Sequence, residues 1–288
     1  MRYLEGIGWK WKQIGGVFVS YRRLPLFNRH LFKIQRVKGV RDLSELIEFA
    51  KEIKTLAIVV EPHFDDFDEG VYDKYGFCAS RICYAPSATL QIDLGKSEDG
   101  LWKEMSENAR RNAKFASRSK IKIDFVDDYN GSEFIDQMYE QWRHVSDLRK
   151  FHMPSRKEIL IKYEALKKLT VFSKATDSEG EVLACVWFVV FGNCVTYLHA
   201  GNSDKGYECK ANFLLVWESI KYFKQRGYAV FDFESFYDKR YPRTTKRWKG
   251  FSEFKSKFGG EVKYYPAPRI LHFNSMFRYL SLIGEALS

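Results

Sequence analysis

Long apolar runs and a compositional linker are both missing from this chain of 288 residues. The longest apolar run, Val182 to Leu198, is interrupted by Gly192-Asn193 and is too short to span a bilayer. The segment Met1–Gln13 is rich in Trp and Lys and lacks the apolar length of a signal peptide. We therefore expect neither a signal peptide nor a membrane-spanning segment, and we interpret residues 182–198 as two strands joined by a turn.

Cysteine and histidine are also scarce, and neither residue is spaced as a disulfide framework or a metal site. The five cysteines form no Cys-x-x-Cys pair, and their odd number argues against a disulfide scaffold. His63, His144 and His152 do not have the spacing of metal ligands. The acidic cluster at 65–69 lacks the alternating ligands and the distal glutamate of an EF-hand loop. We therefore expect a reducing, cytoplasmic compartment, no metal ion and no cofactor.

Positive charge and aromatic side chains are abundant. The chain has 47 basic and 37 acidic residues, and its formal net charge is +10. This surplus favours a polyanionic partner such as nucleic acid, anionic lipid or a diphosphate-bearing substrate, without choosing between them. A basic surface with no such partner is the alternative. The aromatic content of 17% predicts ring-lined pockets in addition to a core.

Helical and strand patterns alternate along the whole chain. In the first half, a helix is predicted from Asp42, strands at 56–60, 89–94 and 121–126, and a long basic helix from about Ser97 to Ser119. In the second half, helices are predicted at 131–150, 155–169, 209–226 and 268–287. Strands are predicted there at 171–175, 182–191, 195–200 and 229–233.

This order of elements predicts a mixed α/β (α+β) fold. Helix, strand, loop and final strand occur in both halves, as expected for two copies of one unit. We predict two tightly packed lobes at 1–130 and 131–288, in which the sheets are flanked by helices. The C-terminal helix is expected to be able to pack back on the first lobe.

The stretch from Asp232 to Gly260 combines the end of an apolar strand, a basic loop and a lysine among aromatic rings. Lys255 lies between Phe254 and Phe258 and precedes a Gly-Gly turn. Rings that restrict water near an ammonium group strengthen its field on a nearby oxygen, which suits stabilisation of an oxyanion. The alternative is a helix that is capped by glycine and packs its phenylalanines into the core.

Several short segments carry a combined pattern across most of the chain. In order they are Gly8-Trp9, Val59-Val60-Glu61-Pro62, Gly76-Phe77, Ile92-Asp93-Leu94, Tyr197-Leu198-His199-Ala200-Gly201, Trp217-Glu218, Asp232 and Phe254-Lys255-x-x-Phe258-Gly259. Together they resemble the Fem-type (FemABX) peptidyltransferases, which add amino acids from aminoacyl-tRNA to peptidoglycan stem peptides. The resemblance implies two fused acetyltransferase-like (GNAT) lobes. No sustained heptad pattern is present, so we expect no coiled-coil arm of the kind that some members carry.

The resemblance also implies the reaction and its residues. It implies an aminoacyltransferase that uses aminoacyl-tRNA as co-substrate and a UDP-linked or lipid-linked muropeptide precursor as acceptor. Lys255 would stabilise the oxyanion, and Glu61 would position or deprotonate the attacking amine. The alternative for Glu61 is a strand-end carboxylate satisfied by loop amides. The substrate-binding candidates are Lys12, Arg149, Arg156, Tyr197, His199, Asp232 and Phe254.

Three positions depart from the pattern of the family. Glu61 replaces an aspartate, and His199 replaces a tyrosine, which puts the hydrogen-bonding role of that tyrosine in doubt. The phosphate-binding lysine of the family falls on Gln13, with Lys12 one place earlier. Arg156 is preferred over Arg149 as the residue that grips a diphosphate.

Two basic segments are candidate contacts for phosphates. Basic residues mixed with rings suit an RNA acceptor end, and the tRNA-binding candidates are Arg243, Lys246, Arg247, Trp248 and Lys249. The strip from Arg110 to Lys122 would meet either tRNA or anionic lipid headgroups, which predicts peripheral contact with the inner face of the cell membrane. The alternative for both segments is a solvated face.

Other functions remain open on the sequence alone. One is a conventional acyltransferase that uses acyl-CoA, although the turn at 206–212 has no glycine pair for a pyrophosphate. A second is an aminoacyl-tRNA transferase with a different amine acceptor. A third is a non-catalytic protein that binds RNA or a membrane surface on the same scaffold.

Overall fold

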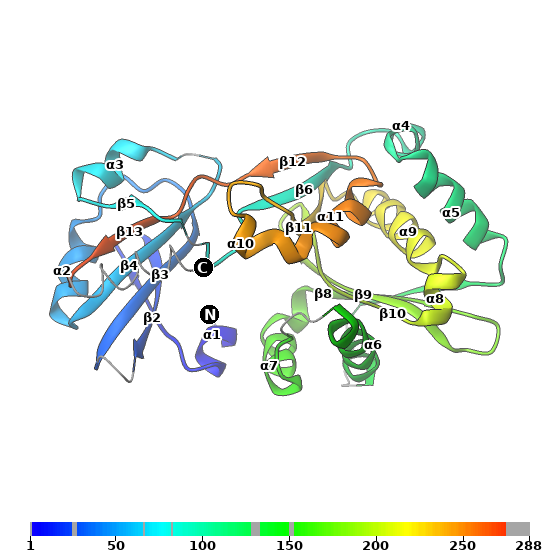
Figure 1. Cartoon of the computed structure of the whole chain (residues 1–288), viewed down its shortest axis with the longest axis horizontal. Coiled ribbons are helices and arrows are strands. Elements are labelled where there is room, and N and C mark those ends of the chain that lie inside the picture. The colour runs from blue at the N-terminus through cyan, green and yellow to red at the C-terminus, as the bar shows by residue number, and fades with distance from the viewer. Residues whose placement is uncertain are drawn as a thin grey trace. The chain divides into compact units, whose positions relative to one another are not determined.

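The computed structural model describes residues 2–24, 28–65, 67–81, 83–127, 133–149 and 153–274. These residues contain two mixed β-sheets, each with helices packed on it (Figure 1). The chain divides into two units, and both are assembled from segments that are distant in sequence. The first unit comprises Met1–Ala88, Tyr237–Arg247 and Lys263–Ser288, and the second comprises Thr89–Phe236 and Trp248–Val262.

The first unit is built on a six-stranded sheet of order β1-β2-β3-β4-β13-β5. Its strands are β1 (Lys10–Ile14), β2 (Val17–Leu24), β3 (Arg29–Val37), β4 (Thr55–Pro62), β5 (Cys78–Ala79) and β13 (Arg269–His272), and its helices are α1 (Arg2–Gly6), α2 (Ser44–Glu52), α3 (Glu69–Lys74) and α10 (Pro242–Thr245). β3 and β4 are parallel, whereas the other pairs are antiparallel.

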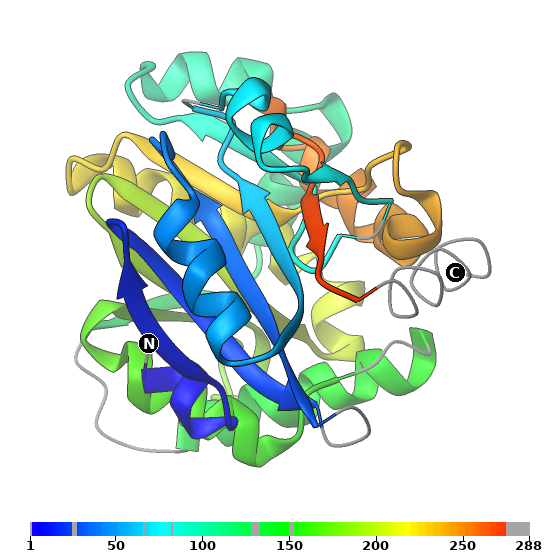
Figure 2. The ribbon, with the colours of Figure 1, turned by 90° about the vertical axis from the view of Figure 1, so that its left-hand side faces the viewer.

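The core of the first unit lies between this sheet and α2, which crosses the strands in Figure 2. Phe32 and Ile34 point to the side of α2, where Leu46 and Ala50 are buried against them. The alternate residues of β3 therefore point to the opposite face of the sheet, as the period of two in a strand requires.

The second unit is built on a seven-stranded sheet of order β12-β6-β11-β10-β9-β8-β7. Its strands are β6 (Ala88–Asp93), β7 (Lys122–Asp127), β8 (Thr170–Thr176), β9 (Val182–Phe191), β10 (Cys194–Asn202), β11 (Val230–Ser235) and β12 (Glu261–Tyr264). Its α-helices are α4 (Glu98–Glu104), α5 (Glu107–Ser117), α6 (Glu133–Arg149), α7 (Arg156–Leu166), α8 (Asp204–Glu208), α9 (Ala211–Gln225) and α11 (Lys249–Ser256). Two 3-10 turns span Lys167–Leu169 and Lys246–Trp248.

Helices cover both faces of the second sheet, so its inner strand β9 is buried on two sides. Phe188 belongs to the core under α5 and α9, whereas Trp187 belongs to the core under α6 and α7. In Figure 1, α5 and α9 lie on one side of the sheet and α6 and α7 on the other. The apolar run from Val182 is therefore a strand enclosed by two helical layers rather than a membrane segment. None of the helices in the described ranges has the length and apolar character needed to cross a membrane.

The predicted α/β fold with two lobes of mixed sheets and flanking helices is confirmed, and no coiled-coil arm is present among the described residues. The units divide the chain at different residues from the predicted lobes 1–130 and 131–288. The segment 89–127 belongs to the second unit because β6 pairs with β11 and β7 pairs with β8. Strand pairing between distant segments, which no local pattern reveals, therefore sets the division.

Two predicted helices differ from the structure. The helix predicted at 97–119 is two helices, because Met105 is extended and Ser106 caps α5 by accepting a hydrogen bond from the Ala109 amide. The segment predicted as a helix from Pro268 begins instead with strand β13, which pairs with β4. The remainder of that prediction, from residue 275, lies outside the described residues.

A close approach between α8 and β9 explains one glycine of the turn at 206–212. A Cβ atom added to Gly206 would lie 2.0 Å from the Leu183 carbonyl oxygen, which is a backbone atom and cannot rotate away. This glycine therefore permits α8 to pack directly on the strand.

We predict that Gly206→Ala destabilises the protein by at least about 1–3 kcal/mol, the usual range for overpacking, because the clash is with backbone. Thermal denaturation followed by circular dichroism measures the effect. Gly70→Ala in α3 is the matched control, since its Cβ would meet only the Asp68 side chain at 3.4 Å. Equal melting temperatures for the two variants would contradict the role of this contact.

Candidate active site

Two parallel neighbouring strands of the second sheet separate at their carboxyl ends. β10 and β11 pair only from Cys194 to Thr196 and from Val230 to Asp232, although both strands continue beyond these residues. Both strands are also irregular there, with register shifts after Tyr197 in β10 and after Asp232 in β11. Carboxyl ends of adjacent parallel strands that separate are a common place for a ligand in α/β proteins.

Lys255 reaches the end of β11 from α11. Its ammonium donates hydrogen bonds to the carbonyl oxygens of Phe233 at 2.7 Å, Ser235 at 2.9 Å and Glu234 at 3.4 Å. Glu234 has a φ of 53°, a left-handed conformation that accompanies the irregularity of the strand. The ammonium therefore holds together three successive carbonyl groups at the irregular end of β11.

The ammonium of Lys255 is buried among rings, as the sequence suggested. Lys255 is 7% exposed, and its Nζ atom lies 4.8 Å from the centre of the Phe251 ring and 5.9 Å from that of Tyr197. Burial lowers the pKa of Lys255 to about 8, against the opposing effect of the negative charges of Glu234 and Asp232. The group remains mostly protonated at neutral pH, where it provides a positive charge with little water around it.

Asp232 fixes the strand next to this lysine. Its carboxylate accepts hydrogen bonds from the Thr89 hydroxyl, from Gln91 Nε2 at 2.8 Å and from the Glu234 amide at 2.6 Å. Thr89 and Gln91 belong to β6, so Asp232 ties β6 to the irregular end of β11. With 8% exposure and three donors, the carboxylate orients the backbone around Lys255.

His199 forms a second polar group on β10, together with a lysine from α7. Lys162 Nζ lies 3.3 Å from His199 Nε2, and the Trp142 ring of α6 lies 4.3 Å from the imidazole ring at an angle of 31°. Burial, and then the positive charge of Lys162, hold the pKa of His199 well below its usual range. A neutral His199 accepts the Lys162 hydrogen bond on Nε2, so its proton lies on Nδ1.

Glu234 connects the two lysines electrostatically. Burial lowers the pKa of Lys162, and the carboxylate of Glu234 opposes this shift, as it does for Lys255. Both ammonium groups are therefore within the field of one carboxylate. The region around the separated ends of β10 and β11 thus contains the amines of Lys255 and Lys162, the carboxylates of Asp232 and Glu234 and a neutral imidazole.

Tyr197 and Phe254 lie in the core under α9. Tyr197 contacts Phe188 and Phe233, and Phe254 contacts Phe213 at a ring distance of 5.2 Å. His199, by contrast, contacts Trp142 and Trp187 on the other face of the sheet. In a regular strand, residues two positions apart point to the same face of the sheet. The register shift between Tyr197 and His199 breaks this rule, so these two substrate-binding candidates lie on opposite faces.

Glu61 lies in the first unit, at the end of β4. It is 3% exposed and accepts hydrogen bonds from the amides of Tyr84 at 2.7 Å and Ala85 at 2.6 Å and from Gln35 Nε2 at 2.9 Å. This geometry matches the alternative in which loop amides satisfy the carboxylate. Glu61 therefore anchors the loop that precedes β6.

Lys33, which was not a candidate, shares the face of the first sheet on which Glu61 lies. Its ammonium lies 4.5 Å from the centre of the Tyr84 ring and 5.0 Å from that of Trp9, and burial lowers its pKa against the effect of Glu61. Lys12 lies on the opposite face, 4.3 Å from the Phe49 ring of α2. In β3, Phe32 and Ile34 face the core, so Lys33 between them must point to the opposite face of the sheet. This alternation could have identified Lys33 as a candidate if β3 had been recognised as a strand.

The other candidates lie on the surface. Arg156 begins α7 and pairs with Asp136 at 2.6 Å, and this hydrogen bond raises the pKa of the guanidinium. Arg149 is the last residue of α6, and its side chain lies outside the described part of the structure. Arg243, Lys246, Arg247 and Lys249 are exposed along α10, the following 3-10 turn and the start of α11, and Trp248 is partly buried between them.

Among the described residues, no group of three or more His, Cys, Asp or Glu side chains is arranged to hold a metal ion. The described cysteines are all free thiols. For three of them, Cys83, Cys185 and Cys194, burial raises the pKa of the thiol. Such thiols are poor nucleophiles at neutral pH.

Comparison with known proteins relates this fold to a family. The FemAB family model matches residues 152–277. The crystal structure of FemX is similar, with a TM-score of 0.80 and 14% identity over 97% of this chain and 92% of that chain. No curated protein matches the sequence.

Two further structures have a similar fold. L-PGS from Bacillus licheniformis has a TM-score of 0.63 and 13% identity, over 99% of this chain and 90% of that one. The C-terminal domain of a putative lysylphosphatidylglycerol synthetase from Agrobacterium fabrum has a TM-score of 0.60 and 13% identity, over 98% and 89%. The predicted resemblance is therefore confirmed, and the chain has a Fem-type, double GNAT-like fold.

We predict that Lys162→Met raises the pKa of His199, because it removes the neighbouring positive charge, while burial still keeps that pKa below the usual range. Titration of the imidazole resonances by NMR measures the shift. Lys162→Arg keeps the charge and is the matched control, for which the pKa of His199 should stay low. Identical titration curves for Lys162→Met and the unmodified protein would show that Lys162 does not act on His199.

Proposed function

We propose that this protein is an aminoacyltransferase that moves an amino acid from aminoacyl-tRNA to the side-chain amine of a peptidoglycan precursor stem peptide. The observation that carries the proposal is the buried ammonium of Lys255 at the separated ends of β10 and β11. The Fem-type fold and the FemAB match, which covers Lys255, support the same class of reaction.

The reaction needs little beyond alignment and charge stabilisation, because the ester of aminoacyl-tRNA is already activated. The acceptor amine attacks the ester carbonyl carbon, an amide bond forms, and the bond to the ribose oxygen breaks. The amine loses a proton, and the released ribose hydroxyl gains one. The charge that develops on the carbonyl oxygen is the feature that a buried cation stabilises most.

In this proposal, Lys255 stabilises the oxyanion by giving up one of its three hydrogen bonds to the backbone and donating that bond to the substrate oxygen instead. The bond to the Glu234 carbonyl is the longest at 3.4 Å and therefore the weakest. The bonds to Phe233 and Ser235 would keep the ammonium in place while the third donor turns to the substrate. Asp232 would hold the surrounding backbone rigid, which reduces reorganisation in the transition state.

The remaining candidates have supporting roles in the proposal. Glu61 would position the loop at 84–85 rather than remove a proton, since three donors already occupy its carboxylate. Lys33, between Trp9 and Tyr84, would replace Lys12 as the N-terminal cation for an anionic substrate group.

A lipid acceptor is the second candidate function. The C-terminal domain of a putative lysylphosphatidylglycerol synthetase shares the fold over 98% of this chain. The transfer chemistry would be the same, except that a lipid hydroxyl would replace the amine as nucleophile. The acceptor therefore has to be established by experiment.

The test is a transfer assay with charged, radiolabelled tRNA and three acceptors, namely a UDP-linked muropeptide, a lipid-linked muropeptide and phosphatidylglycerol. Label on either muropeptide supports the proposed function and identifies the form of the acceptor. Label only on phosphatidylglycerol supports the second candidate. Absence of label from every charged tRNA would refute both.

We predict that Lys255→Met lowers the turnover of this reaction by about 100- to 1,000-fold, the usual effect of removing one oxyanion donor, with little change in tRNA affinity. Single-turnover kinetics and filter binding measure the two quantities. Lys257→Met, two residues further along the chain, is the matched control and should retain turnover. Equal losses of tRNA affinity and turnover in Lys255→Met would show that the lysine grips the substrate instead.

We further propose that the exposed basic segment from Arg243 to Lys249 contacts tRNA phosphates. The double variant Lys246→Gln/Arg247→Gln should weaken tRNA binding and lower the slope of log K against log salt concentration by about 1.4–1.8, because two phosphate contacts are lost. Lys157→Gln/Lys168→Gln, at two exposed lysines outside the candidate tRNA contacts, changes the net charge equally and is the matched control. The same reduction in slope for both double variants would exclude a specific contact at 243–249.

A further inference from the structure

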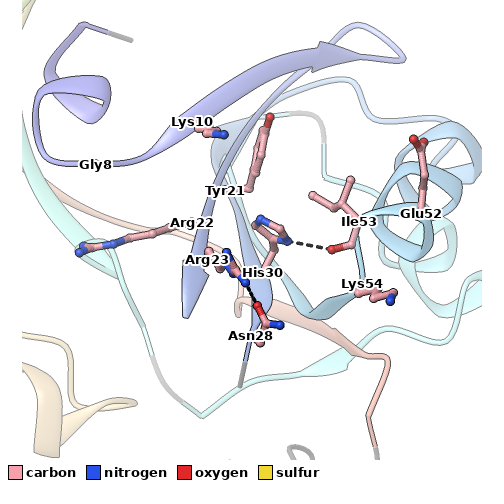
Figure 3. Close-up of a pocket in the computed structure, with 10 residues that line it drawn as sticks. All are labelled: Gly8, Lys10, Tyr21, Arg22, Arg23, Asn28, His30, Glu52, Ile53 and Lys54. Carbon is pink, nitrogen blue, oxygen red and sulfur yellow. Dashed lines mark hydrogen bonds between the residues drawn. The ribbon is translucent and has the colours of Figure 1, made fainter. Parts of the chain in front are cut away.

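A basic hollow lies at one end of the sheet of the first unit (Figure 3). It encloses about 610 Å³, and its lining includes Lys10, Arg23 and Lys54, together with His30, from β1, β2, β3 and the turn after α2. Arg22 also borders the hollow, but its side chain points away from the other lining residues in Figure 3. Glu52 is the one acidic residue among the lining residues. Such an excess of cations around one concavity favours an anion.

The strand register explains why these side chains converge. Lys10 pairs with Tyr21 across β1 and β2, and Arg23 pairs with His30 across β2 and β3. Tyr21 and Arg23 are two residues apart on β2, so all four side chains share the face of the sheet that α2 covers. Lys54 approaches from the turn between α2 and β4, where its φ of 55° is left-handed.

Two hydrogen bonds hold His30 and Arg23 in place at the hollow. His30 Nδ1 lies 2.8 Å from the Ile53 carbonyl oxygen, to which it donates a hydrogen bond. This contact offsets the partial negative charge at the carboxyl end of α2, which would otherwise repel an anion. Arg23 donates to the Asn28 side chain, which fixes the guanidinium at the wall of the hollow, and Figure 3 shows both contacts.

The other cations have no compensating partner. Within the described residues, the side chains of Lys10 and Lys54 form neither a hydrogen bond nor an ion pair with the protein, and both residues are exposed. Unpaired like charges around one concavity repel one another, and a bound anion would relieve that repulsion.

The hollow is separate from the candidate site at Glu61. It lies beside Thr55, where β4 begins, whereas Glu61 lies six residues later at the end of the same strand. Six residues of strand span about 20 Å. A ligand in the hollow would therefore leave the loop held by Glu61 untouched.

We propose that this hollow binds a phosphate group, either of a phospholipid headgroup or of free phosphate. A compact concavity with cations on several walls suits one or two phosphoryl groups. A nucleic-acid backbone would instead require an extended row of contacts along a groove. The inference is independent of the proposed function, because it concerns a different end of the first sheet.

The experiment compares ligand binding by the unmodified full chain with binding by the double variant Lys10→Gln/Lys54→Asn. Asparagine is chosen at position 54 because it tolerates the left-handed backbone there. Lys157→Gln/Lys168→Asn, at two exposed lysines of the second unit, changes the net charge equally and is the matched control. The probes are inorganic pyrophosphate by calorimetry, and vesicles of phosphatidylcholine with or without phosphatidylglycerol by co-sedimentation. Equal melting temperatures establish that both variants fold.

We expect pyrophosphate to bind the unmodified protein and the control variant equally, and the hollow variant at least tenfold more weakly. Loss of vesicle binding in the hollow variant alone, with competition by pyrophosphate, would identify a lipid headgroup as the source. Equal vesicle binding by all three proteins would identify free phosphate. Equal pyrophosphate affinity of the two variants would overturn the proposal. The proposal would also fail if the hollow variant lost affinity only for a short RNA hairpin, used as a further probe, and kept its affinity for pyrophosphate.

Discussion

The hydrogen bonds from the Lys255 ammonium to three successive carbonyl groups organise the second unit around its candidate site. The carbonyls of Phe233, Glu234 and Ser235 accept these bonds where β11 becomes irregular beside β6. The lysine therefore helps to fix the backbone of β11 beyond the residues that pair with β10. The same ammonium is the one positive charge that the proposed chemistry requires, so the stability of this region and its reactivity depend on one group.

Charge in this region is balanced by few groups. Burial is the largest cause of the lowered pKa values of Lys255, Lys162 and His199. Glu234 opposes this effect for both lysines, and the charge of Lys162 adds to it for His199. At neutral pH, Lys255 is therefore mostly protonated and His199 is neutral, which gives the region a buried cation suited to an oxyanion.

The two units use aromatic rings and lysines in a similar way. Lys255 lies beside Phe251 and Tyr197 in the second unit, and Lys33 lies between Trp9 and Tyr84 in the first. In both places burial lowers the pKa of the ammonium and a carboxylate opposes the shift. The high aromatic content therefore serves partly to surround cations with rings that limit their hydration. The basic hollow differs, since its cations face solvent and lack a nearby ring cage.

The sequence by itself determined the elements with strong periodicity and the motif around Lys255. The buried strands at 56–60, 89–94 and 182–191 and the glycine-capped helix α11 follow from local patterns, which residues close in sequence create. The fold family followed from the order of short segments along the chain. The tertiary structure alone decided which candidates meet, because a register shift separates Tyr197 from His199 and strand parity separates Lys12 from Glu61. It also revealed Lys33 and Lys162, since contacts between distant segments depend on pairing that no local pattern encodes.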